Sequence, residues 1–146
     1  MNILTTLVMI IVGSYSAKPQ QYIAQPISTI ERCICNNVTP QESNIVDFLR
    51  MFENSSMTNE IETSEHANEL LFSLLSIYPY ETIIGMGNIE PACRKRVYAQ
   101  LCRPIHDGMD ICSISNKLKA IRFRTIKHYF ISRKVQQVLS SLKPLS

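Results

Sequence analysis

Apolar residues recur at intervals of three and four along most of this chain, and prolines stand where several of these runs begin or end. Such spacing places apolar side chains on one face of an α-helix. Thr39-Pro40-Gln41-Glu42 combines a residue that can cap a helix, a proline suited to the first turn and a glutamate that can reach back to the cap. We therefore expect a helix from this motif to about Phe52.

Two more helices are expected in the middle of the chain. Thr63 can cap one that ends at Pro79, because proline interrupts helical hydrogen bonding. Another should run from Pro91 to about Leu101, again with proline in the first turn. Between them, Glu81–Ile89 contains two glycines and several β-branched residues, which predicts a loop or a short strand.

The C-terminal part of the chain is strongly basic. From Ile111 onward there are eight lysines and arginines and no acid, whereas residues 31–90 contain ten acids and two bases. The two parts can offset each other by packing together, or the basic part can form a surface for an acidic partner. Both interpretations stay open, and they are compatible.

The basic segment itself is predicted to be helical. Ser115 can cap a helix that starts at Asn116, but the apolar residues beyond it fall on three different faces. This pattern indicates either a helix buried on two sides or a break near Ser132. Residues 121–125 also alternate like a strand, although the alternation fails at Ile126.

These patterns predict one all-α domain. Hydrophobic residues make up 45% of the sequence and charged residues 18%, which is typical of a globular chain. We expect a small disulfide-stapled bundle of four to five helices over residues 39–146, with a basic C-terminal segment at 113–143. A disulfide-linked α+β fold is the alternative, and the capped helices argue against it.

The N-terminal residues indicate a secreted protein. An uncharged apolar run over residues 1–12 is followed by mostly small residues up to Ala17, the pattern that a signal peptidase needs. We expect a signal peptide at 1–16, cleaved after Ser16 or Ala17, and an extended leader at 17–38. An uncleaved anchor is the alternative, but the run is shorter than the ~20 apolar residues that span a bilayer.

The five cysteines are expected to form disulfides in an oxidising compartment. Cys33 and Cys35 are too close to pair with each other, and a helix would place Cys93 and Cys102 on opposite faces. Cys33 and Cys35 should therefore pair with two of Cys93, Cys102 and Cys112. The remaining cysteine leaves a disulfide-linked homodimer, a bond to another chain and a free thiol as alternatives.

Two sequons, at Asn37 and Asn54, predict N-glycosylation of exposed positions. We expect neither a metal nor a cofactor, because there is no Cys-x-x-Cys pair and the histidines are scattered. Two basic clusters, Arg94-Lys95-Arg96 and Arg133-Lys134, are of the kind that processing proteases recognise. Cleavage after Arg96 or Lys134 stays open, although cleavage inside a helix requires local unfolding.

No motif in the sequence indicates an enzyme. It contains no Gly-x-Ser-x-Gly elbow, no His-Glu-x-x-His and no glycine-rich phosphate loop. His106 and His128 could act as a general acid and base on a phosphodiester only if the fold brought them together. The simpler interpretation is a turn residue and a residue on a helix face, so we expect no catalytic residues.

Two partial resemblances concern the N-terminal cysteines and the overall layout. Arg32-Cys33-Ile34-Cys35 resembles the opening of a CXC chemokine, but the helical stretch from Pro40 to Tyr78 departs from that fold. The layout of a signal peptide, amphipathic helices, few disulfides, sequons and a basic last helix is similar to that of short-chain helical cytokines. This second resemblance is architectural and implies a helical ligand for a receptor.

The sequence therefore predicts a secreted, non-enzymatic signalling ligand of cytokine or hormone type. Its partner is expected to be a receptor ectodomain or a sulphated glycan, and nucleic acid is not expected. The alternatives are a membrane-active defence or venom-type protein, and a small secreted hydrolase that uses His106 and His128. The expected binding residues are the bases of the last helix: Lys119, Arg122, Arg124, Lys127, Arg133 and Lys134.

Overall fold

The computed structural model describes residues 24–54, 60–105 and 107–142. All the regular elements in these ranges are helices, with no strand among them, so the expected all-α fold is confirmed. In chain order they are residues 24–35, α2 (Glu42–Arg50), the 3-10 turn η1 (Met51–Glu53), α4 (Ile61–Ile77), α5 (Pro79–Gly87), α6 (Pro91–Leu101), α7 (Ile111–Ala120) and α8 (Ile126–Ser141).

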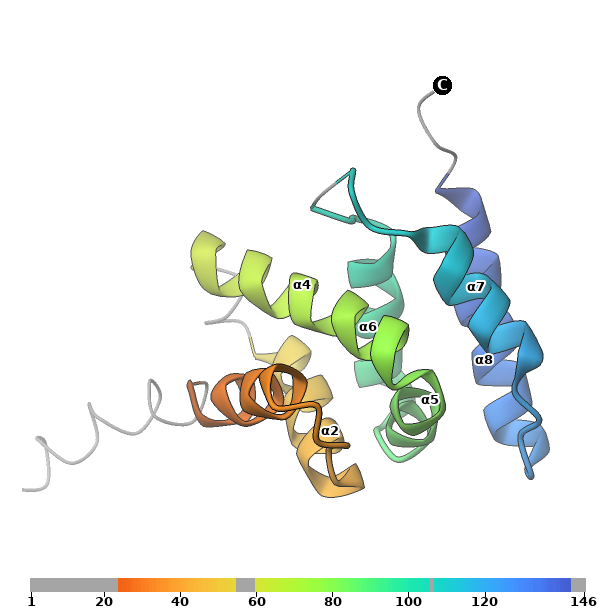
Figure 1. Cartoon of the computed structure of the whole chain (residues 1–146), viewed down its shortest axis with the longest axis horizontal. Helices are drawn as coiled ribbons and strands as arrows, with labels where there is room; N and C mark the ends of the chain where they lie inside the picture. Colours follow the sequence, from red (N-terminus) through yellow and green to blue (C-terminus); the bar gives the residue numbers. More distant parts are fainter. Residues whose placement is uncertain (1–23, 55–59, 106, 143–146) are drawn as a thin grey trace, which may run out of the picture.

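The short helix α5 lies at the centre of the arrangement (Figure 1). It packs against α2 and α4 on one side and against α7 and α8 on the other. α4 leads directly into α5 through a bend of 116°. α7 and α8 lie side by side, and α8 also contacts α6. The C-terminal helices are thus attached to the rest of the molecule mainly through α5 and α6.

The core is continuous across these helices. Each of α2, α4 and α5 contributes side chains with no exposed surface, and this burial of apolar area is the main stabilising term in a domain of this size. Across the N-terminal helical segment and helices α2 and α4–α7, the largest side chains that are almost fully buried are Phe48, Ile30, Ile45, Leu49, Leu71, Leu74, Leu75, Ile83, Met86, Leu101 and Leu118.

The expected extended leader is wrong over residues 24–35, which are helical. Ile27 and Ile30, three residues apart, are buried against the core and explain why this segment folds as a helix. The helix ends in paired hydrogen bonds from Val38 N–H to the Cys33 carbonyl and from Asn37 N–H to the Ile34 carbonyl. This closure places Asn37 in the left-handed region, with φ of 52°, a conformation that asparagine tolerates.

The loop or strand expected at residues 81–89 is also wrong, because most of this segment belongs to α5. Its glycines allow close packing and do not mark a turn. A Cβ added at Gly85 would lie 2.6 Å from Ile45 Cγ2, so α5 can approach α2 this closely only without a side chain there. The requirement comes from the partner helix and is not visible in the local sequence.

The ends of the expected central helices are partly confirmed. α4 ends at Ile77, just before the predicted stop at Pro79, and α6 has the predicted bounds. The Thr39 cap is not formed: Gln41 is extended, and α2 begins only at Glu42, without a side-chain cap. Thr63 does not cap α4 either, because it lies inside the helix and donates a hydrogen bond to Glu60.

The basic segment is two helices, and the predicted start and break are both displaced. α7 begins at Ile111, where the Asp110 carboxylate accepts a hydrogen bond of 2.9 Å from Ser113 N–H. The chain leaves the helix at Ile121, with φ of −82° and ψ of 132°, and re-enters one at Ile126. The break therefore lies at residues 121–125, where the sequence alternates like a strand, and Ser132 is inside α8.

The structure does not support the expected disulfide staple. All five cysteines lie among the described residues and carry free thiols: Cys33, Cys35, Cys93, Cys102 and Cys112. Cys93, inside α6, is fully buried, and Cys102, directly after the end of α6, is exposed, in agreement with the prediction that the two do not face the same way.

The expected signal peptide lies outside the described residues. Within the described ranges, no single helix has the length and apolar character to cross a membrane, although the bent pair of α4 and α5 meets these criteria when taken together.

Candidate functional site

The six predicted binding residues are all exposed, but they do not belong to one helix. Lys119 lies in the last turn of α7, and Arg122 and Arg124 lie in the connection that follows. Lys127, Arg133 and Lys134 lie on α8. We call these six residues the basic surface. The first four fall within nine residues of chain around the junction of α7 and α8, and the last two lie about two turns farther along α8.

Two local interactions hold this junction in place. Thr125 caps α8, since its Oγ1 accepts a hydrogen bond of 3.3 Å from His128 N–H. Phe123, in the connection, stacks on Tyr80 of α5 with ring centroids 5.8 Å apart and planes only 5° from parallel. The connection is therefore anchored to the central helix, and its two arginines project from a fixed backbone.

The first two turns of α8 also expose apolar side chains. Ile126 is 75% exposed, Phe130 63% and Tyr129 52%. We call these three residues the apolar strip. The opposite face of α8 packs into the core through Ile131 and Val135, which are almost fully buried. The helix thus has two apolar faces, and only one of them is covered by the rest of the described chain.

The basic surface and the apolar strip share the outward face of α8. Ile126 and Phe130 are four residues apart, so their side chains are neighbours along the helix. Lys127 and Lys134 are seven residues apart and flank this pair on one side, while Arg133 lies one turn beyond the pair. Long basic side chains in such positions can extend past apolar neighbours and keep their charge in water.

No base of the basic surface forms an ion pair within the described residues. The ion pairs within the described residues join Arg50 to Glu90 at 4.0 Å and His66 to Glu31 at 3.4 Å and Glu69 at 3.9 Å. None of them includes a base from residues 111–142. The acidic and basic parts of the chain therefore do not neutralise each other through ion pairs there, and the field of the basic surface extends into solvent over about one Debye length.

His128 is held by contacts within the fold. Its Nδ1 lies 2.6 Å from Thr125 Oγ1, and a Cβ added at Gly87 would lie 2.5 Å from its Nε2. Burial, reinforced by Lys127 and Arg94, lowers the pKa of His128, and Glu42 opposes this effect. His106 lies outside the described residues, so a pairing of the two histidines has no support from these contacts.

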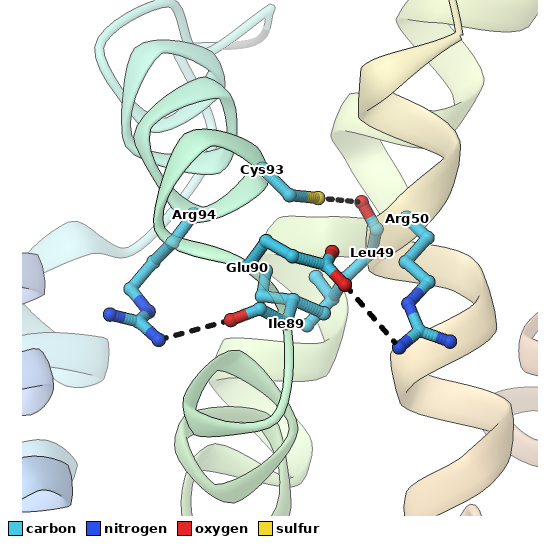
Figure 2. A network of polar contacts seen from close by, with 6 residues as sticks. All are labelled: Leu49, Arg50, Ile89, Glu90, Cys93 and Arg94. Atoms are coloured by element: carbon cyan, nitrogen blue, oxygen red, sulfur yellow. Dashed lines mark hydrogen bonds and ion pairs between the residues drawn. The ribbon is translucent and has the colours of Figure 1, made fainter.

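In the basic cluster at the start of α6, Arg94 bonds to backbone carbonyls of the same molecule (Figure 2). Arg94 Nε donates to the Met86 carbonyl at 2.8 Å, and its Nη2 donates to the Ile89 carbonyl at 3.1 Å. A cation that binds the carbonyls at and just beyond the C-terminal end of α5 stabilises that helix end. Arg94 therefore fixes the join between α5 and α6, whereas the neighbouring Arg96 is exposed.

Cys93 points from α6 toward α2, on the other side from Arg94 (Figure 2). Its thiol donates a hydrogen bond of 3.4 Å to the Leu49 carbonyl. Burial, together with the carboxylates of Glu53 and Glu90, raises the pKa of Cys93 to about 11. A thiol in this environment stays protonated at neutral pH and is unreactive.

A cavity of about 340 Å³ lies between the N-terminal helical segment and α2. Its lining includes Gln25, Thr29, Asp47 and Arg50, so its two charges are of opposite sign. None of the predicted binding residues reaches it. Among the residues that the structure describes, no three His, Cys, Asp or Glu side chains come together in a group that could hold a metal ion.

The bases of this surface could be identified from the sequence, but its apolar part could not. The signal is that the apolar residues of the last helix fall on more than one face, a pattern that indicates either burial on two sides or a break near Ser132. One of those faces covers the core, and another, formed by Ile126 and Phe130, faces outward. The contact of Tyr80 with the connection has no local signal, because the sequence predicts a loop or strand for Glu81–Ile89, directly after Tyr80.

Comparisons with protein-family models, with curated protein sequences and with solved structures found no match to this chain.

Proposed function

We propose that this protein is a secreted, non-enzymatic signalling ligand of cytokine or hormone type, which binds an acidic receptor ectodomain or a sulphated glycan. The observation that supports this proposal is the basic surface: six exposed bases, four at the junction of α7 and α8 and two farther along α8, none of which forms an ion pair with an acid among the described residues. A concentrated positive field attracts a polyanion and accelerates its encounter with the protein.

The arrangement of the bases favours a linear or extended anionic partner. Four of the bases gather where α7 joins α8, and two continue along α8. A chain of sulphate groups or a row of carboxylates can contact both parts at once. Because the bases are exposed, their attraction should decrease as the salt concentration rises.

The proposal includes secretion after removal of residues 1–16 and N-glycans at Asn37 and Asn54. Asn37 is exposed in the turn after the N-terminal helical segment, which is a suitable place for a bulky modification. For the oxidised protein, we assign Cys93 as the cysteine with a free thiol, because its sulfur is buried and already hydrogen-bonded. Any disulfides would then involve the other four cysteines, within one molecule or between two.

Retention on immobilised heparin tests the proposal. The triple variant Arg122→Glu, Arg124→Glu and Lys127→Glu should elute at a clearly lower salt concentration than the parent protein. A matched control reverses the same number of exposed bases elsewhere: Lys95→Glu, Arg96→Glu and Arg103→Glu. Far-UV circular dichroism checks that both variants remain folded.

The control separates a defined site from the effect of net charge. If binding uses the basic surface, the first variant loses retention and the control keeps most of it. Equal losses in both variants would mean that retention follows net charge alone and would refute the proposed site. Unchanged retention in the first variant would refute it as well.

A further inference from the structure

We propose that the apolar strip Ile126, Tyr129 and Phe130 inserts into the interface of an anionic phospholipid bilayer, while the surrounding bases bind the lipid phosphates. The protein would then be a peripheral membrane binder that approaches the bilayer with the outward face of α8. This proposal uses bases of the same surface as the proposed function, but it depends on a different observation, the exposed apolar side chains.

The exposure of the strip is the first argument. Three large apolar side chains that are 52–75% exposed on two adjacent turns form one patch, and such patches mark contact sites. Helix α8 packs on the core through Ile131 and Val135 on its buried face. The apolar strip is therefore not needed to attach the helix. An amphipathic helix of this kind, with its apolar side outward, is suited to lie in a membrane interface.

The chemistry of the flanking residues is the second argument. Lys127, Arg133 and Lys134 surround Ile126 and Phe130, and Arg122 and Arg124 lie just before them in the chain. Bases next to inserted apolar side chains can reach lipid phosphates while their stems remain in the interface. A tyrosine at the edge of the patch can leave its hydroxyl at the headgroup level.

Charge also argues against a symmetric dimer of this chain through the strip. A symmetric dimer through this face would place the basic surfaces of two molecules against each other. No acid of residues 111–142 could pair with them, because that segment contains none. A negatively charged bilayer supplies the missing complementary charge and an apolar interior together.

Cosedimentation with vesicles provides the first test. The purified protein is mixed with vesicles of phosphatidylcholine alone or with added phosphatidylserine. The double variant Ile126→Ser and Phe130→Ser should bind the anionic vesicles at least about tenfold more weakly than the parent, because two apolar side chains no longer insert. The matched control removes two exposed apolar side chains elsewhere, Val38→Ser and Ile61→Ser, and should bind like the parent.

A tryptophan reporter provides a readout that a purely electrostatic contact would not change. The sequence contains no tryptophan, so Phe130→Trp introduces a single tryptophan, whose emission can be followed separately from that of the six tyrosines. Its emission should shift to shorter wavelength with phosphatidylserine vesicles and should not shift with soluble heparin. Ile61→Trp, at an exposed position on α4, should show no shift with either.

Heparin retention of the double serine variant separates this proposal from the proposed function. We expect this variant to keep its heparin retention and to lose its binding to anionic vesicles. Equal vesicle binding by the parent and this variant, or no shift for Phe130→Trp, would overturn the membrane proposal and leave the heparin result standing. A dimer in sedimentation velocity that this variant disrupts would also overturn it, because the strip would then bind a second copy.

Discussion

Gly85 provides a sharp test of how α5 is packed. An alanine Cβ at this position would lie 2.6 Å from Ile45 Cγ2, 3.3 Å from Ile45 Cβ and 3.6 Å from Leu49 Cδ1. Ile45 is fully buried, and a β-branched side chain in a helix has essentially one χ1 rotamer, so it cannot turn away. The helices must move apart instead, which disturbs the contact that attaches α2 to α5.

The magnitude follows from two opposing effects. Overpacking of a buried contact costs ~1–3 kcal/mol, and the absence of a relaxation route favours the upper half of that range. Replacing glycine with alanine inside a helix recovers ~1 kcal/mol. Gly85→Ala should therefore lower the free energy of unfolding by about 1–2 kcal/mol, or the urea midpoint by about 0.5–1 M.

Urea denaturation followed by circular dichroism at 222 nm measures this difference, with the redox state of the cysteines held constant. Gly108→Ala is the matched control, because no atom lies within 4 Å of a Cβ added there. The control should be neutral or slightly stabilising. If Gly85→Ala proves as stable as Gly108→Ala, the close approach of α5 to α2 is incorrect.

Three further predictions concern single side chains. In the reduced protein, iodoacetamide should modify the exposed Cys112 long before Cys93, whose pKa burial raises to about 11; equal rates by mass spectrometry would contradict its burial. The lowered pKa of His128 means that the unfolded chain binds this proton more readily, so stability should fall as the pH drops below its ordinary value of 6.5. Urea midpoints at several pH values should show that His128→Gln removes this contribution; an unchanged profile would refute it. Arg94→Ala should lose about 1–3 kcal/mol in the same assay, because two carbonyls near the end of α5 lose a charged donor; no loss would contradict that role.

Helices could be predicted from the sequence where a run of regularly spaced apolar residues begins or ends at a proline. α4 and α6 follow this rule, since Pro79 limits one and Pro91 begins the other. α5 could not be predicted, because Gly85 has the local features of a turn and its actual role depends on Ile45, forty residues earlier in the chain. Interactions of this kind appear only when the partner helix is in place.

The candidate site, like the fold, has a part that could be predicted from the sequence and a part that could not. Exposure of the six bases follows from their charge, because unpaired lysine and arginine are rarely buried. The exposed strip at Ile126 and Phe130 could not be predicted, because a second apolar face on a helix is equally compatible with a second buried contact. Residues 121–125 alternate like a strand, but the sequence predicts a helix there with a possible break only near Ser132. The projection of Arg122 and Arg124 at a helix junction depends on the stacking of Phe123 on Tyr80.

The most direct test of the central claim is to map where an anionic ligand contacts the protein. Backbone amide chemical shifts of the isotopically labelled protein, recorded by NMR with and without a heparin oligosaccharide, give this map residue by residue. We predict that the largest changes fall within residues 119–134, on both sides of the junction between α7 and α8. Changes concentrated instead in residues 24–54, around the cavity beside α2, would contradict the account.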